Sequence, residues 1–213
     1  TGDLSKRKLL PAIEKLVSAH AVPQQIKVVG ITRRHVSAKQ ILQALPDGVA
    51  HGFLTQNLQM FTMDLTKKRD YQSLQRYLEE LAADMGGDVQ KLFYLSVPPQ
   101  ISQPIVRLLG ETDMAKEPNT KLLLEKPFGI DLASAQDLIN QTKLHFQENQ
   151  VYRIDHYLAK DMAQNLIVFR EGNALFSHTW NKDFIERIDI VASEKIGIEG
   201  RAAFYEQTGA LRD

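Results

Sequence analysis

The sequence predicts an α/β protein with a doubly wound parallel sheet. Its apolar segments at 26–31, 91–97 and 121–124 lack the polar–apolar alternation of a strand that has one face in water. Segments with helical spacing separate them, which is typical of strand–helix–strand units. Of the 213 residues, 43% are hydrophobic, which is enough for a buried core. We therefore expect a Rossmann-like sheet with helices on both faces.

The first half of the chain alternates helix and strand signals. A helix begins within the first dozen residues, with Pro11 in its first turn or at a kink. The strand at 26–31 is followed by a capping box that starts at Ser37 and opens a second helix. A weaker strand at 58–62 precedes a helix that ends before the glycine pair at 86–87.

The second half continues this pattern and then changes. Asp131 caps a long helix that runs to about residue 146. Residues 184–192 alternate apolar and polar side chains, which predicts a strand with one solvated face. We therefore expect a dinucleotide-binding domain at 1–155 and the beginning of an α+β domain at 156–213. The other predicted elements are a strand at 91–97 stopped by two prolines, helices at 101–109 and 158–169, and strands at 121–124 and 151–154.

Charge and cysteine content narrow the class of protein. The 26 basic and 26 acidic residues cancel, so no global field favours nucleic acid or an anionic membrane. Any phosphate must be held by local groups. The chain has no cysteine, no apolar run of membrane-spanning length and no signal-peptide pattern, so we expect a cytoplasmic protein. The isolated histidines predict no metal site.

The first residues look like part of a phosphate-binding turn. Gly2, Asp3 and Leu4 resemble the second half of a glycine turn, ahead of a basic helix start that could place a pyrophosphate against free amides. A plain basic surface explains the same residues equally well. Because the strand before the turn is absent and the chain stops at Asp213 without a closing signal, we expect part of the working protein to be missing.

The stretch at 153–160 contains several side chains that could bind a ligand or take part in catalysis. Asp155, His156, Tyr157 and Lys160 follow a short apolar strand, and the carboxyl end of a parallel strand is where open α/β sheets bind ligands. An aspartate can orient a histidine, whereas the other three side chains can donate to a phosphate or a hydroxylated ligand. The alternative is an ordinary solvated helix start.

Two further strand ends carry cations. Arg33 and Arg34 follow the strand at 26–31, where dinucleotide folds read the adenosine ribose, and arginine there favours the 2′-phosphate of NADP over NAD. The alternative is two surface arginines on a loop. Lys126 ends the strand at 121–124, and Pro127 provides a rigid bend that would aim this cation at the bound ligand.

The whole chain resembles the glucose-6-phosphate dehydrogenase family, over its coenzyme domain and the start of its larger α+β domain. The most specific motif is the stretch 153–160. The other motifs that carry the resemblance, in chain order, are Gly2-Asp3-Leu4, Gly30-Ile31-Thr32-Arg33, Glu125-Lys126-Pro127-Phe128-Gly129-Ile130-Asp131-Leu132, Gln164-Asn165-Leu166, Trp180-Asn181, Glu199-Gly200-Arg201 and Gly209-Ala210-Leu211-Arg212-Asp213.

The resemblance implies NADP-dependent oxidation of glucose 6-phosphate at C1 to 6-phosphogluconolactone, the first step of the pentose phosphate pathway. It implies a homodimer or tetramer for the full-length protein. It assigns the 2′-phosphate to Arg33 and usually makes the peptide bond before Pro127 cis. The remaining implied roles are pyrophosphate binding by Gly2, Asp3 and Leu4, contact with substrate and nicotinamide by Lys126, phosphate binding by His156, Tyr157 and Lys160, sugar-hydroxyl binding by Glu194 and Asp213, and orientation of the catalytic histidine by Asp155.

The resemblance also has gaps. The family's general-base histidine belongs to a motif beyond the position of Asp213, and His156, the nearest substitute, is assigned to phosphate. Ala159 stands where the family usually has glycine. Two alternatives therefore remain open: a module that binds NADP or sugar phosphate without turnover, and another Rossmann oxidoreductase with a Glu-Lys-Pro lysine, which would accept unphosphorylated sugar.

Overall fold

The computed structural model describes residues 2–23, 25–49, 51–191, 193, 202 and 206. Within these residues the strands form two parallel sheets, which confirms the predicted α/β class. The smaller sheet pairs β1 (Val28–Thr32) with β2 (Leu58–Thr62). The larger sheet has the order β3 (Lys91–Leu95), β4 (Thr120–Glu125) and β5 (Val151–Ile154).

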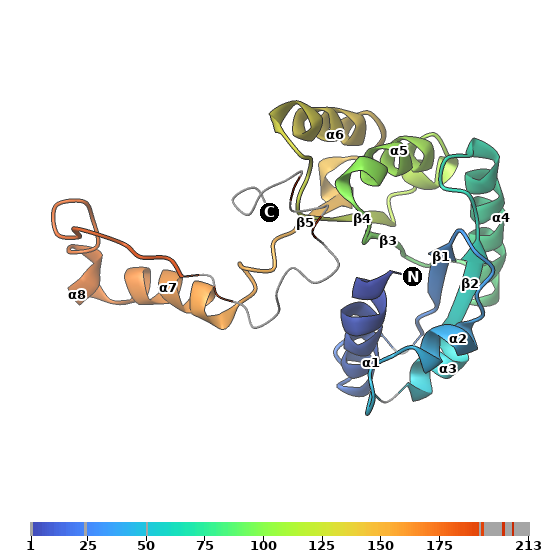
Figure 1. Ribbon diagram of the computed structural model, residues 1–213, viewed down its shortest axis with the longest axis horizontal. Coiled ribbons are helices and arrows are strands. Elements are labelled where there is room, and N and C mark those ends of the chain that lie inside the picture. Colours follow the sequence, from blue (N-terminus) through green and yellow to red (C-terminus); the bar gives the residue numbers. More distant parts are fainter. Residues whose placement is uncertain are drawn as a thin grey trace.

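The two sheets correspond to the two halves of a doubly wound sheet. In the usual order 3-2-1-4-5-6, the first strand lies centrally and joins the two halves. Among the described residues, β1 pairs only with β2 and β3 pairs only with β4. The predicted single sheet is thus divided, because no described residue forms a strand between β1 and β3. The start of the chain lies near this division (Figure 1).

Three of the helices begin where local signals placed them. Pro11 lies in the first turn of α1 (Leu10–Ser18), which continues a π-helix, η1 (Ser5–Leu9). Ser37 forms the expected capping box with Gln40 at the start of α2 (Ala38–Gln43), and Asp131 caps α6 (Leu132–His145). No described helix is both long and apolar enough to cross a bilayer. The other helices are α3 (Gly52–Asn57), α4 (Lys68–Asp84), α5 (Pro99–Gly110), η2 (Asp113–Lys116), η3 (Glu148–Gln150), α7 (Asp161–Gly172) and α8 (Ala174–Ser177).

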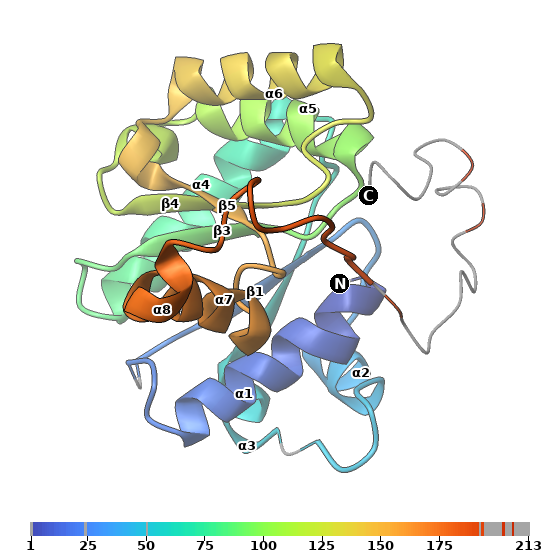
Figure 2. The same cartoon turned by 90° about the vertical axis from the view of Figure 1, so that its left-hand side faces the viewer.

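Two apolar clusters hold these layers together. The larger one lies between the β3–β4–β5 sheet and helices α4, α5 and α6, and it includes Leu109, Met114 and Leu122, each at most 1% exposed. The smaller one joins α1, α2, α3 and β2 through Leu10, Ile41, Leu54 and Leu58. Each such buried side chain stabilises the fold by about 1.5–3 kcal/mol. Figure 2 shows α5 and α6 side by side over the larger sheet and α1 beside α2 and α3.

The end of the described chain differs from its prediction. Residues 184–191 form no strand, and Ile190 is 90% exposed. A strand with one solvated face needs a neighbouring strand for its backbone hydrogen bonds, and no described segment supplies one. Ala192, the last predicted strand residue, lies outside the described part. Helices α7 and α8 extend away from the two sheets (Figure 1), and Phe169 of α7 stacks on Phe176 of α8.

Candidate functional site

An ion pair joins the loops that follow β4 and β5. The two strands are parallel neighbours, with Glu125 opposite Ile154, so Lys126 and Asp155 leave the sheet side by side. Lys126 Nζ lies 2.6 Å from Asp155 Oδ2, and both side chains are partly exposed. The Lys126–Pro127 peptide bond is cis, as the resemblance implies. The sheet register therefore brings together a cation and an anion that are 29 positions apart in the sequence.

Asp155 is held in its charged form. Its other oxygen, Oδ1, accepts a hydrogen bond from the backbone N–H of Tyr157 at 3.1 Å. The hydrogen bond from Lys126 lowers the pKa of Asp155 below its ordinary value, and the Tyr157 N–H and the charges of Lys126 and His156 act in the same direction. Asp155 is therefore an anion at neutral pH, with both carboxylate oxygens engaged.

The three residues assigned to phosphate form one exposed cluster after β5. The rings of His156 and Tyr157 lie 4.4 Å apart, and Lys160 Nζ lies 4.3 Å from the centre of the Tyr157 ring. The predicted helix start at residue 158 was wrong, because residues 156–160 form a turn and α7 begins at Asp161. The turn folds Lys160 back towards Tyr157, and all three side chains are exposed and carry hydrogen-bond donors.

The loop that carries Lys126 is held at its far end by α6. A Cβ at Gly129 would lie 2.6 Å from the backbone nitrogen of Ala135, so only glycine fits against this helix. Phe128 packs against the larger core. Ser134 Oγ accepts from the backbone N–H of Ile130 at 3.0 Å, and its own N–H donates to Asp131 Oδ1 at 2.8 Å. These contacts leave the loop little freedom between β4 and α6.

Arg33 and Arg34 lie at the carboxyl end of β1, on the smaller sheet. Thr32 Oγ1 accepts from the Arg34 N–H at 3.2 Å and donates to the Arg34 carbonyl at 3.0 Å, which fixes the turn that carries both arginines. His35 Nδ1 lies 3.4 Å from Thr62 Oγ1, at the end of β2. Both guanidinium groups belong to exposed residues, so the donor set fits an anion such as a 2′-phosphate.

The proposed pyrophosphate residues lie at the start of the first helix. Leu4 is the residue before η1, and Arg7 Nη1 lies 3.4 Å from Asp3 Oδ2. The carbonyl of Gly2 accepts from the backbone N–H of Lys6. The amides of this first turn have no earlier helical turn to bond to, which is the feature that anions use at helix N-termini.

The structure thus assembles part of the predicted site. It brings Lys126 to Asp155 and gathers His156, Tyr157 and Lys160, whereas Arg33 belongs to the other sheet. Glu194 and Asp213 lie outside the described residues. The roles of all these residues stay predictions, as does the domain boundary at 155.

Sequence reasoning missed the partners that hold these groups. Tyr94 on β3 donates to Glu125 at 2.5 Å, and Thr32 shapes the arginine turn. The available signal for Tyr94 and Thr32 was a polar side chain inside, or at the end of, an otherwise apolar strand.

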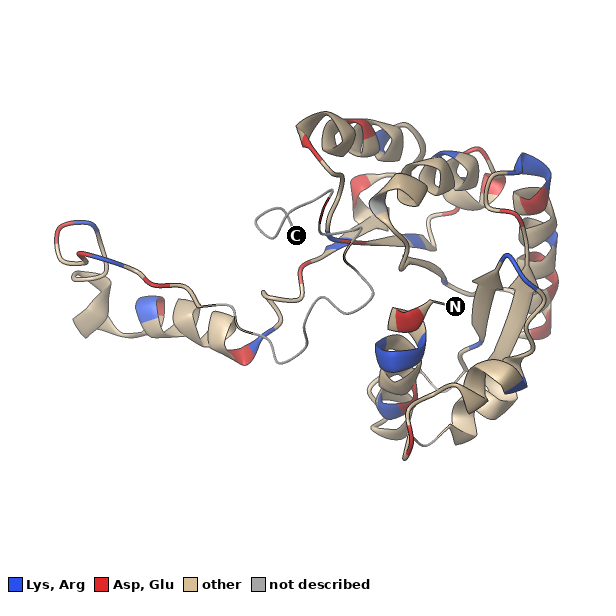
Figure 3. Cartoon of the chain, in the orientation of Figure 1, with Lys and Arg blue, Asp and Glu red and all other residues tan. Residues whose placement is uncertain are grey.

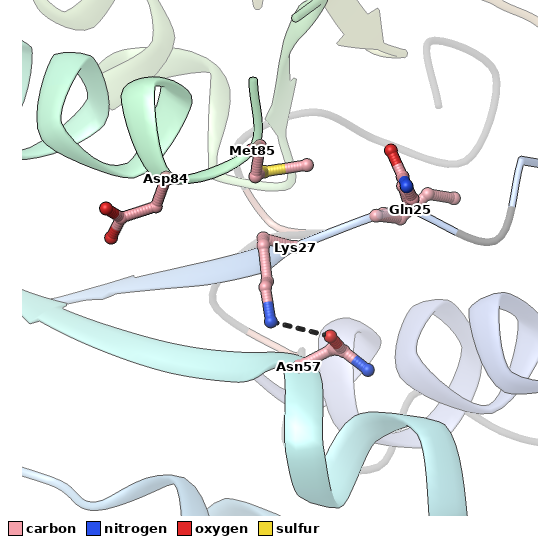
Figure 4. Close-up of a pocket in the computed structure, with 6 residues that line it drawn as sticks. Gln25, Lys27, Asn57, Asp84 and Met85 are labelled. Atoms are coloured by element: carbon pink, nitrogen blue, oxygen red, sulfur yellow. Dashed lines mark hydrogen bonds between the residues drawn. The ribbon is translucent and has the colours of Figure 1, made fainter. Parts of the chain in front are cut away.

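A surface pocket lies at the other end of the smaller sheet. A cavity of about 290 Å³ lies at the amino ends of β1 and β2, opposite the ends that carry the site residues. Lys27 Nζ donates to Asn57 Oδ1 at 2.9 Å across it (Figure 4). The lining residues are Gln25, Ile26, Lys27, Asn57, Asp84 and Met85. We place the site at the carboxyl ends of the strands, because Lys126, Lys160 and the ordered Asp155 carboxylate are there.

Basic and acidic residues are mixed on the helices. They are interspersed over α1 and α4 (Figure 3), as expected for a chain without net charge. An anionic ligand would therefore be recognised by the individual cations at the strand ends.

Comparison with known proteins gives one consistent result. Residues 1–165 match the family model described as "Glucose-6-phosphate dehydrogenase, NAD binding domain", and residues 167–213 match the model of the C-terminal domain. The chain is 37% identical over 220 residues to glucose-6-phosphate 1-dehydrogenase of Bacillus subtilis and 34% identical over 223 residues to that of Leuconostoc mesenteroides. All of the chain is covered in both cases, against 45% and 46% of the relatives, so the chain spans about half their length.

Solved structures agree. The fold is similar to a glucose-6-phosphate dehydrogenase in complex with its substrate glucose 6-phosphate, with a TM-score of 0.85 and 30% identity over all of this chain and 46% of that one. It is also similar to glucose-6-phosphate 1-dehydrogenase from Mycobacterium avium, with a TM-score of 0.77, 27% identity, and coverage of all of this chain and 47% of that one.

Proposed function

Because the chain belongs to the glucose-6-phosphate dehydrogenase family, we propose that it serves the NADP-dependent oxidation of glucose 6-phosphate at C1 to 6-phosphogluconolactone. The observation that supports this most directly is the 2.6 Å ion pair between Lys126 and Asp155. It places a cation and an oriented carboxylate at the carboxyl edge of a parallel sheet, beside the donors of His156, Tyr157 and Lys160. That combination suits a ligand with both a phosphate and a reacting hydroxyl.

Each residue has a distinct proposed task. His156, Tyr157 and Lys160 bind the phosphate and so set the register of the sugar, which brings C1 to the reacting position. Lys126 contacts the substrate near the reacting carbon, and Glu194 and Asp213 hydrogen-bond the sugar hydroxyls. Asp155 orients the histidine that takes the hydroxyl proton and stabilises its charged form.

We assign NADP to the edge that carries Arg33. Arg33, with Arg34 beside it, binds the 2′-phosphate, and Gly2, Asp3 and Leu4 approach the pyrophosphate at the start of η1. Lys126 would contact both the substrate and the nicotinamide. When bound, the nicotinamide accepts the hydride from C1. We further propose that the full-length protein forms a homodimer or tetramer.

A second function is favoured by the partners of Asp155. In the described residues its carboxylate contacts Lys126 and the Tyr157 amide, and no contact joins it to a histidine that could act as base. This arrangement suits a module that binds glucose 6-phosphate or NADP without turning it over.

Calorimetry and an NADPH absorbance assay would separate these functions. We expect glucose 6-phosphate, but not glucose, to bind the 213-residue chain. Lys160→Ala should weaken this binding by at least about tenfold, because a charged hydrogen bond is worth about 1.5–3 kcal/mol. Lys182→Ala, an exposed lysine beyond α8, is the matched control. NADPH formation supports the dehydrogenase, binding without NADPH supports the module, and equal binding of glucose overturns both.

Coenzyme preference needs its own variant. Arg33→Ala should weaken NADP binding at least tenfold and leave NAD binding nearly unchanged, because only NADP carries the 2′-phosphate. Equal losses for both coenzymes would contradict the assignment of Arg33.

A further inference from the structure

A hydrogen bond within the larger sheet lies directly behind the loop that carries Lys126. Tyr94 is paired with Leu123 in the β3–β4 register, and side chains two positions apart on a strand share a face. Glu125 therefore lies on the same face as Leu123, diagonal to Tyr94. The Tyr94 hydroxyl donates to Glu125 Oε1 at 2.5 Å in a partly buried setting.

Tyr94 keeps its hydroxyl proton at neutral pH. Burial, followed by the hydrogen bond and charge of Glu125, raises the pKa of Tyr94 above its ordinary value. The phenol therefore remains a donor, and the carboxylate accepts a charge-assisted bond, which is stronger than a bond between neutral groups. The bond fixes the last residue of β4.

Lys126 is the residue that directly follows Glu125. Glu125 is opposite Ile154 in the β4–β5 register, so the next residues on the two strands are Lys126 and Asp155, whose ion pair measures 2.6 Å. The far side of the loop is held by the close approach of Gly129 to Ala135. The loop is thus fixed at two ends, and Tyr94 holds the β4 end through its hydrogen bond with Glu125.

We propose that Tyr94 and Glu125 are positioning residues that hold Lys126 in place for the sugar-phosphate ligand. Neither side chain has to touch the ligand. They act by anchoring the residue before Lys126, so that its ammonium group lies beside Asp155 before the ligand arrives. The consequence for affinity rests on the proposed function, whereas the consequence for the Lys126–Asp155 pair does not.

Two measurements on the 213-residue chain test this. Carbon-13 NMR follows the titration of the Asp155 carboxyl, assigned with Asp155→Asn, and calorimetry follows binding of glucose 6-phosphate. The variants are Tyr94→Phe, which removes one hydroxyl, Glu125→Ala, which removes the acceptor, and Glu125→Gln, which keeps an acceptor. The matched control is Tyr77→Phe, because Tyr77 also donates to a side chain, Gln59, but joins α4 to β2.

In Tyr94→Phe and Glu125→Ala, we expect the pKa of Asp155 to rise towards its ordinary value of about 3.9 and glucose 6-phosphate affinity to fall about three- to tenfold. Glu125→Gln should resemble the wild type in both measurements. Tyr77→Phe should leave both unchanged even if unfolding shows lower stability.

The outcomes separate the two proposals. If Tyr94→Phe loses stability as Tyr77→Phe does while the Asp155 titration is unchanged, the bond is only structural and the positioning role is overturned. If the Asp155 titration shifts as expected but the wild type binds no glucose 6-phosphate, the positioning of Lys126 is supported and the proposed function fails.

Discussion

Replacement of Glu14 by alanine should destabilise the half of the molecule that contains β1. Glu14 lies on α1 and is only 6% exposed. Its two oxygens accept from the backbone N–H groups of Phe53 and Leu54, both at 3.0 Å, in the first turn of α3. A carboxylate at that position satisfies amides that have no partner within the helix. The side chain therefore ties α1 to α3 across 39 residues of sequence.

The expected loss is about 1.5–4 kcal/mol. Leu54 is fully buried, so its N–H would be left unpaired away from water, at a cost of about 1–3 kcal/mol. The N–H of Phe53 is partly buried and can bond to water, so its loss adds about 0.5–1 kcal/mol. For a chain of this size, the sum lowers the thermal midpoint by about 3–16 °C.

Thermal and urea unfolding followed by circular dichroism would measure this loss, and hydrogen exchange of the Leu54 amide would localise it. Glu79→Ala is the matched control, because Glu79 is an exposed residue of α4 that accepts from the side chain of Gln75. It should change stability by less than about 0.5 kcal/mol. Glu14→Gln keeps one acceptor oxygen and should fall between the two. If Glu14→Ala unfolds at the same midpoint as Glu79→Ala, the reasoning from buried amides is refuted.

Three further changes give distinct results. The hydrogen bond from Lys126 lowers the folded-state pKa of Asp155. The ion pair therefore contributes its full stability above the unfolded-state pKa of about 3.9, and this contribution is lost as pH falls through the lower folded-state pKa. Urea midpoints measured over this fall in pH should drop less in Asp155→Asn than in the wild type, and equal slopes would contradict the linkage. Gly129→Ala should push the Lys126 loop away from α6 and weaken glucose 6-phosphate binding in calorimetry by about tenfold, and unchanged affinity would show that the loop adapts. Thr32→Val should remove both bonds to the arginine turn and lower NADP affinity about fivefold with little effect on NAD, whereas a parallel loss for NAD would point to general misfolding.

Local signals predicted the elements well. Ser37 and Asp131 begin helices because their side chains accept backbone N–H groups three positions along, a contact that needs no other part of the chain. The helix α4 ends before Gly86 and Gly87, which both adopt positive φ. The weak strand prediction at 58–62 matches β2 residue for residue.

Predictions that depended on distant partners were less complete. The alternating residues at 184–191 remain without strand structure, since alternation specifies a face but supplies no neighbouring strand. The short helix α3 has no capping side chain of its own. Its first turn is satisfied by Glu14, which no local pattern connects to residue 53.

The sequence by itself determined the α/β class, the order of the elements, the family, and which side chains stand at strand ends. The tertiary structure alone decided that Lys126 meets Asp155, that Tyr94 anchors Glu125, and that Arg33 lies on a separate sheet from both pairs. The reason is physical: helix starts and turns depend on bonds within a few residues, whereas these pairs depend on strand order and register, which arise only when the sheet forms.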